Sequence, residues 1–222
     1  MSILKTTITA VTLTAATATS AQIYDNFSTP QWVAIASPQV SLYEQVNKLL
    51  ISFNQGTNGA VFSGGYYSTC KLTGDFDIST DYGIPVYPDG NGVRIGLIVD
   101  VEQKNGVWFN QTWAAMERIS SAPASSFYGA DFSRYGSSGS MTQTTDTRGK
   151  FRLTRVGTTL TGYYWDWAAA AWISSNVTTS FTSSPVYFGL TAWSHDSVFG
   201  KVATKVSFDN MLINAGNCVP VS

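Results

Sequence analysis

Three segments of the sequence carry aromatic or charged residues at alternating positions. They comprise Tyr163, Trp165 and Trp167 in the first, Tyr187, Thr191, Trp193 and His195 in the second, and Arg94, Asp100 and Glu102 in the third. Alternate residues of a β-strand point to the same side of a sheet, so each set shares one face. Sugars stack their C–H faces on aromatic rings and exchange hydrogen bonds with carboxylates and guanidinium groups. If the three faces coincide, they form an aromatic floor with charged rims. The alternatives are that the rings belong to the core and the charges to a solvated sheet face.

The candidate ligand-binding residues are therefore Tyr163, Trp165, Trp167, Tyr187, Trp193 and Arg118. If the protein is an enzyme, the candidate catalytic residues are Arg94, Asp100, Glu102 and His195. Asp100 and Glu102 are two positions apart, which puts their carboxylates on one strand face about 7 Å apart. A glycoside hydrolase can use such a pair. Lysis of a uronate polysaccharide would instead need a cation, Arg94 or Arg118, and a base, His195 or a tyrosine. His195 is the only histidine, and its alternative role is that of a hydrogen-bonded loop residue.

Cofactor and partner motifs are few. Asp89-Gly90-Asn91-Gly92 and the pair Asp75 and Asp77 offer oxygens to a calcium ion, although the Asp89 segment also fits a simple turn. Zinc-binding spacings, a P-loop and a dinucleotide fingerprint are missing from the sequence. The formal net charge of -1 argues against a nucleic-acid partner, which would require a basic surface. We expect no required cofactor, with calcium as an option.

The elements that must position these residues are short strands. Alternating segments bounded by Gly, Pro, Asn, Asp and Ser predict an all-β chain. The expected strands are 22–27, 31–35, 48–53, 76–82, 93–102, 113–120, 171–177, 186–193 and 205–213, with a hairpin over 151–165. The segment 41–48 fits a short helix, and 121–149 lacks periodicity and is expected to be a long loop. No repeat or linker divides the chain.

The first 21 residues have the pattern of a secretory signal peptide. Lys5 precedes an apolar stretch over 7–18, and Thr19-Ser20-Ala21 supplies small residues at a cleavage site. Cleavage after Ala18 and a short amphipathic segment are the alternatives. No stretch is long enough to span a membrane. We therefore expect a secreted, extracellular protein with one domain over 22–222.

Two cysteines, Cys70 and Cys218, remain in the mature chain. An even number in a secreted protein predicts a disulfide, and two free thiols are the alternative. Asn26, Asn110 and Asn176 begin glycosylation sequons, which matter only in a eukaryotic protein.

Several motifs resemble one superfamily. They are Tyr24-Asp25-Asn26-Phe27, Asn47-Lys48-Leu49-Leu50-Ile51, the segment Gly149 to Tyr164 followed by Trp172, and Val206-Ser207-Phe208-Asp209-Asn210. Together they resemble secreted concanavalin A-like lectins and glucanases of the laminin-G-like group. The resemblance implies a jelly-roll sandwich of two antiparallel sheets whose concave face often holds a glycan, and some members bind calcium. The glucanase E-x-D-x-x-E pattern and the motifs of alginate lyases are missing here. We therefore expect a lectin-like protein that binds an extracellular polysaccharide, with a small polysaccharide lyase or hydrolase as the alternative.

Overall fold

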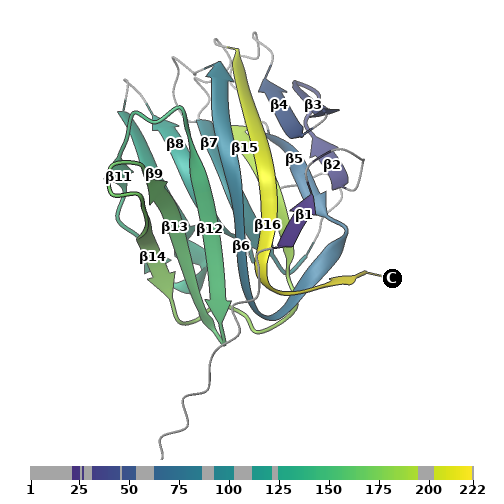
Figure 1. Ribbon diagram of the computed structural model, residues 1–222, viewed down its shortest axis with the longest axis vertical. Coiled ribbons are helices and arrows are strands. Elements are labelled where there is room, and N and C mark those ends of the chain that lie inside the picture. Colours follow the sequence, from purple (N-terminus) through teal and green to yellow (C-terminus); the bar gives the residue numbers. More distant parts are fainter. Residues whose placement is uncertain are drawn as a thin grey trace, which may run out of the picture.

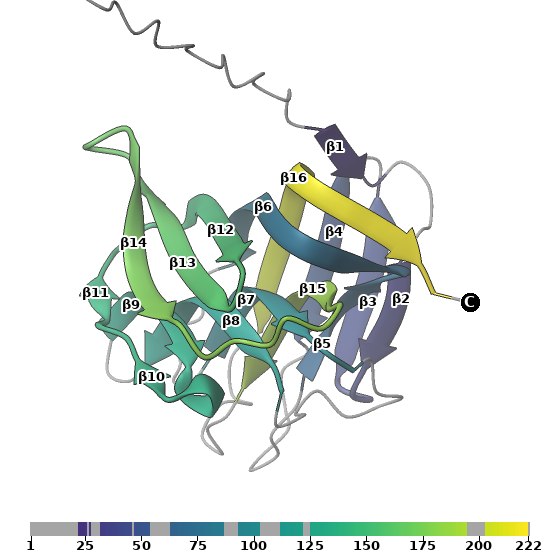
Figure 2. The same ribbon diagram turned by 90° about the horizontal axis from the view of Figure 1, so that it is seen from below.

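The chain folds into two stacked antiparallel β-sheets, as Figure 2 shows. The computed structural model describes residues 22–25, 27, 32–45, 47–53, 63–86, 93–102, 112–121, 125–194 and 203–221. Residues 1–21, which are predicted to form a leader, the segment 89–92 and His195 lie outside the described residues. Within the described ranges, no helix is long and apolar enough to cross a membrane.

Among the described residues, the two sheets, called sheet A and sheet B, contain eight strands each; Figure 1 shows their arrangement. Sheet A has the order β14-β13-β12-β6-β16-β4-β3, with β1 paired to β16. Its strands are β1 (Gln22–Asp25), β3 (Val40–Gln45), β4 (Lys48–Phe53), β6 (Cys70–Val86), β12 (Arg148–Val156), β13 (Thr159–Asp166), β14 (Ala171–Thr178) and β16 (Thr204–Pro220). Sheet B has the order β10-β9-β8-β7-β15-β5-β2, with β11 paired to β9. Its strands are β2 (Trp32–Ala36), β5 (Ser63–Ser68), β7 (Val93–Asp100), β8 (Ala114–Ser121), β9 (Ser125–Phe132), β10 (Ser137–Ser138), β11 (Thr142–Gln143) and β15 (Tyr187–Ser194).

Apolar residues at alternate positions build the core between the sheets. In β7, Val93, Ile95, Leu97 and Val99 are buried in this core, as the sequence predicts. The predicted hairpin is also present, because β12 pairs with β13 and Gly157 adopts the left-handed conformation that the turn needs.

Sheet B is buried on its outer face as well. A second apolar cluster consists of Tyr67, Ile98, Trp113, Ala115 and Tyr187, with Ile35 and Trp193 packed against it. These residues alternate with those of the main core along their strands, so they lie on the opposite side of sheet B. Packed apolar side chains therefore cover part of the outer face of sheet B, which is not a fully solvated sheet surface.

Two of the expectations about local structure are wrong. Residues 41–48 form no helix, because they belong to β3, β4 and the turn between them, where Asn47 has a φ of 68°. The stretch 121–149 is not a single loop, since it contains β9, the 3-10 helix η1 (Ser133–Tyr135), β10 and β11. In β9 the buried side chains of Tyr128, Ala130 and Phe132 alternate with Phe127, Gly129 and Asp131. Small residues on both faces weaken the alternating pattern in the sequence.

The predicted disulfide is confirmed. Cys70 and Cys218 are bonded, with a Cα–Cα distance of 5.4 Å and a sequence separation of 148. The bond joins β6 to the paired end of β16, where Cys218 lies opposite Leu72.

Replacing both cysteines by serine should lower the free energy of unfolding by about 2–5 kcal/mol, because the unfolded chain loses a cross-link across a very long loop. Chemical denaturation of the oxidised wild type and of the C70S/C218S variant measures this difference. Reduced wild type should match the variant. A variant as stable as the oxidised wild type would contradict the expectation.

Candidate functional site

Three strands of sheet B bring Arg94, Glu117 and Trp193 together on its outer face. Arg94 of β7 lies opposite Trp193 of β15, and Glu117 of the neighbouring β8 lies opposite Gly96. A Cβ atom at Gly96 would lie 3.0 Å from the Met116 carbonyl oxygen and 3.2 Å from Glu117 Cγ. The glycine therefore leaves the space in which the Glu117 side chain lies across the sheet.

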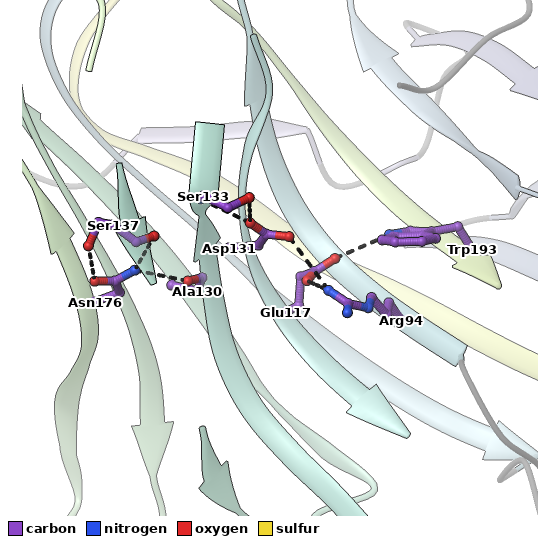
Figure 3. Close-up of polar contacts among 8 residues, drawn as sticks. All are labelled: Arg94, Glu117, Ala130, Asp131, Ser133, Ser137, Asn176 and Trp193. Carbon is purple, nitrogen blue, oxygen red and sulfur yellow. Dashed lines mark hydrogen bonds and ion pairs between the residues drawn. The ribbon is translucent and has the colours of Figure 1, made fainter. Parts of the chain in front are cut away.

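The carboxylate of Glu117 is held at both oxygens (Figure 3). Arg94 Nη1 donates to Oε2 over 3.0 Å, and Trp193 Nε1 donates to Oε1 over 3.1 Å. The Arg94 guanidinium also lies over the Trp193 ring, 5.0 Å from its centroid. These contacts fix the orientation of both donors, because a carboxylate, a guanidinium and an indole must meet in one geometry.

Glu117 has no solvent-exposed side-chain area. Burial raises the pKa of its carboxyl group above the ordinary value of 4.5, while the positive charge of Arg94 opposes that rise. The nearby negative charge of Asp131 raises this pKa further. Glu117 is thus a buried acid that orients its neighbours.

Asp131 of β9 is the second carboxylate on Arg94. Its Oδ2 lies 3.6 Å from Arg94 Nη1, and its Oδ1 accepts hydrogen bonds from the Ser133 amide and hydroxyl groups over 3.1 and 2.6 Å. Unlike Glu117, its side chain is 23% exposed. One oxygen is therefore fixed by the turn, and the other lies beside Arg94.

A cavity of about 170 Å³ lies next to this charged group and is called the sheet B cavity below. Its floor includes Arg94, Glu117, Gly129 and Asp131, and its other lining residues are Ile119, Ala130, Ser133, Ser137, Ser138, Gly139 and Met141. Arg94 Nε is buried and has no hydrogen-bond acceptor among the described residues. The cavity thus places a partly exposed carboxylate beside a largely buried guanidinium.

Asn176 of β14 holds the wall of the sheet B cavity in place. Its Nδ2 donates to the Ala130 carbonyl over 3.1 Å, and its Oδ1 accepts from Ser137 Oγ over 2.8 Å (Figure 3). Gly139 packs on the same side chain, since a Cβ there would come within 2.6 Å of Asn176 Cβ. The Asn176 sequon therefore has its amide nitrogen committed to a structural contact in the folded chain.

Aromatic rings continue along the outer face of sheet B. Trp113 meets Trp193 edge to face at 6.3 Å, and the Arg134 guanidinium lies 4.0 Å from the Trp113 centroid. Trp113 Nε1 is buried and, like Arg94 Nε, has no acceptor within the described ranges. Aromatic and charged groups thus alternate on this face.

The structure brings some of the predicted residues together and separates others. Arg94, Asp100, Tyr187 and Trp193 share the outer face of sheet B. Asp100 is fully buried and its Oδ1 accepts from Thr112 Oγ1 over 2.6 Å. Glu102 does not continue the strand, because β7 ends at Asp100 and the Glu102 amide bonds back to Asp100 Oδ1. The expected pair of carboxylates on one strand face is therefore absent at these positions.

The remaining predicted residues lie elsewhere. Arg118 is 1% exposed on the core side of sheet B, where its guanidinium donates to the carbonyls of Asp146 and Ile119. It is therefore not available to a ligand at the surface. Tyr163 and Trp165 belong to β13 of sheet A, so the expected single aromatic floor is divided between two sheets. His195 lies outside the described residues.

Glu117 and Asp131 are the residues that sequence reasoning missed. Alternation along 113–120 puts Glu117 on the same face as Trp113, and a choice based on that period would have selected Glu117 instead of Arg118. Asp131 was hidden in a segment expected to be a loop.

The part of the chain that is described contains no group of three or more His, Cys, Asp or Glu side chains suited to a metal ion. Asp77 is paired with Arg152 at both carboxylate oxygens, and Asp75 accepts the Gly157 amide. The donor set expected for calcium at Asp75 and Asp77 thus does not fit.

The architecture is that of a concanavalin A-like jelly-roll sandwich. The chain is similar to the lectin UEA-II in complex with galactose, with a TM-score of 0.57 and 8% identity over 82% of this chain and 93% of the lectin. It is also similar to the metal-free lectin I-B4 from Griffonia simplicifolia (TM-score 0.56, 10% identity, 86% and 97% covered). LamAcat from Zobellia galactanivorans is a further similar structure (TM-score 0.54, 11% identity, 88% and 98% covered). Comparison of the sequence with protein-family profiles and with curated proteins finds no match. Identities this low establish the lectin-like fold and leave the function to the site.

The raised pKa of Glu117 predicts a specific pH dependence of stability. The folded protein keeps this proton at pH values where the unfolded chain has lost it, so the stability advantage exists below pH 4.5 and disappears as the pH rises through the folded-state pKa. E117Q stays neutral and lacks this loss. Melting temperatures of the two proteins should converge at low pH, and wild type should fall below E117Q as the pH rises. E102Q controls for the loss of one negative charge, and a pH-independent difference between wild type and E117Q would contradict the assignment.

Proposed function

We propose that the protein is a lectin that binds a neutral sugar in the sheet B cavity. The observation that carries this proposal is the sheet B cavity, in which the partly exposed carboxylate of Asp131 lies beside Arg94. A sugar hydroxyl can donate a hydrogen bond to Asp131 Oδ2, because the turn holds the carboxylate through its other oxygen. No rearrangement of Glu117 is required.

The charges at the cavity favour a neutral ligand. One guanidinium, Arg94, is shared between the carboxylates of Glu117 and Asp131. Its positive charge is therefore already compensated, and a uronate would meet the negative charge of Asp131. The volume of about 170 Å³ is below the range of about 300–1,000 Å³ for drug-sized ligands. A single terminal sugar ring fits this size better than an internal stretch of polysaccharide.

The fold and the covalent structure support this proposal. Lectins with the same architecture include one solved in complex with galactose. The disulfide is typical of an oxidising compartment, and together with the leader predicted over 1–21 it supports a protein that acts outside the cell.

Replacing Asp131 by alanine should weaken sugar binding by roughly 10- to 100-fold, because a charge-assisted hydrogen bond to the ligand is lost. A glycan array with the mature protein first identifies a neutral sugar, and titration calorimetry then compares the variants. D75A is the matched control, since Asp75 is an exposed aspartate that accepts a backbone amide far from the cavity. Equal affinity of D131A and D75A, or no binding of any neutral glycan by wild type, would overturn the proposal.

Hydrolysis remains a second candidate for a specific reason. Glu117, with its raised pKa, and the partly exposed Asp131 lie within 3.0 and 3.6 Å of the same guanidinium nitrogen. Glycoside hydrolases act through two carboxyl groups in different environments, and Glu117 is buried whereas Asp131 is partly exposed. Against this, both oxygens of Glu117 already accept hydrogen bonds.

A reducing-sugar assay on neutral polysaccharides separates the two functions. A hydrolase should release reducing ends, and E117Q should lose about 100-fold or more of that rate, since a general acid contributes about 10²–10⁴-fold. A lectin should release none at any enzyme concentration while still binding the sugar. Formation of unsaturated uronate, followed by ultraviolet absorbance, would instead identify a lyase.

A further inference from the structure

An exposed tryptophan lies at the turn between β13 and β14. Trp167 is 49% exposed, although tryptophan is highly buried on average. Its Nε1 donates to the Arg148 carbonyl over 3.2 Å, and its ring packs edge to face against Trp165 at 6.4 Å. The ring is therefore held in position at the surface, so a ligand that stacks on it loses little additional side-chain entropy.

A cavity of about 250 Å³, called the Trp167 cavity, adjoins this ring. Its lining residues are Tyr128, Thr142, Gln143, Thr144, Asp146, Tyr164, Asp166, Trp167 and Ala168. None of them lines the sheet B cavity. The parallel rings of Tyr128 and Tyr164, 4.4 Å apart, provide a firm base.

Each of the two carboxylates in the Trp167 cavity is anchored by one oxygen. Asp146 Oδ2 accepts from the Tyr128 hydroxyl over 3.0 Å, and Asp166 Oδ1 accepts from the amides of Ala168 and Ala169 over 2.8 and 2.9 Å. The second oxygen of each carboxylate has no hydrogen-bond partner among the described residues. Neither carboxylate has a salt bridge within the described ranges, in contrast to Asp131.

We propose that the Trp167 cavity is a second sugar site, selective for a sugar that carries an ammonium group. The sugar ring stacks on Trp167, and its ammonium group lies between Asp146 and Asp166. The Arg148 guanidinium lies over the Trp167 ring, 5.7 Å from its centroid. The preference for a cation is therefore assigned to the two carboxylates, and the ring supplies the stacking surface. This selectivity differs from that of the sheet B cavity, where Arg94 compensates the carboxylates. A protein with both sites is bivalent and can cross-link glycan chains.

Calorimetry with oligomers of glucosamine and of N-acetylglucosamine tests the proposal, because the two differ in the ammonium group. Wild type should bind the glucosamine oligomer at least about tenfold more tightly, and the preference should shrink at high salt. W167A and D166N should each lose about tenfold in affinity for that oligomer. D166N keeps an oxygen that can accept the Ala168 and Ala169 amides, so the turn is retained.

Matched controls distinguish this site from the sheet B cavity. Y43A removes another exposed ring, which is 53% exposed on β3, and D75N removes another exposed carboxylate. D131A should leave the affinity for the glucosamine oligomer unchanged, because Asp131 lines the sheet B cavity and not the Trp167 cavity. The neutral-sugar site and the Trp167 site are therefore tested independently. Equal binding of both oligomers by wild type, or equal affinity of W167A and Y43A, would overturn the second site.

Discussion

The burial of the Glu117 carboxylate is the constraint on which the outer face of sheet B depends. A charged or protonated acid without solvent needs partners for both oxygens, and Arg94 and Trp193 provide them from the neighbouring strands. Arg94, fixed in this way, also lies 3.6 Å from the Oδ2 atom of Asp131 on β9, so the two carboxylates share one guanidinium. The arrangement therefore couples four strands of sheet B and aligns the polar groups of the cavity before any ligand binds.

The segment from η1 to β11 contributes lining residues to both cavities. Ser137–Gly139 and Met141 form a wall of the sheet B cavity, and residues 142–144 line the Trp167 cavity. Asn176 of sheet A bonds to Ser137 and Ala130 of sheet B and so ties this segment across the edge of the sandwich. Two sites of different charge can arise in this way on one small fold. The sheet B cavity takes its carboxylates from β8 and β9, and the Trp167 cavity takes them from the segment before β12 and from the end of β13.

The predictability of the site differed from residue to residue for physical reasons. Arg94 and Trp193 were identified because each lies in a strand with strong alternation. Arg118 was selected one residue away from Glu117, and a shift of one residue moves a side chain from one face of a strand to the other. Asp131 could not be identified, since β9 carries small residues on both faces. The catalytic pairing of Asp100 with Glu102 failed because β7 ends between them.

Patterns within the sequence were sufficient to predict the all-β class, the sandwich and the disulfide. These depend on local alternation and on an even number of cysteines, which are properties of short segments or of composition. The packing of the whole chain places Tyr163 and Trp165 on sheet A and Tyr187 and Trp193 on sheet B. It also decided that Glu117 and Asp131 share Arg94. Alternation shows which residues of a strand share a face, but strand order in a sheet is set by packing between segments far apart in the chain.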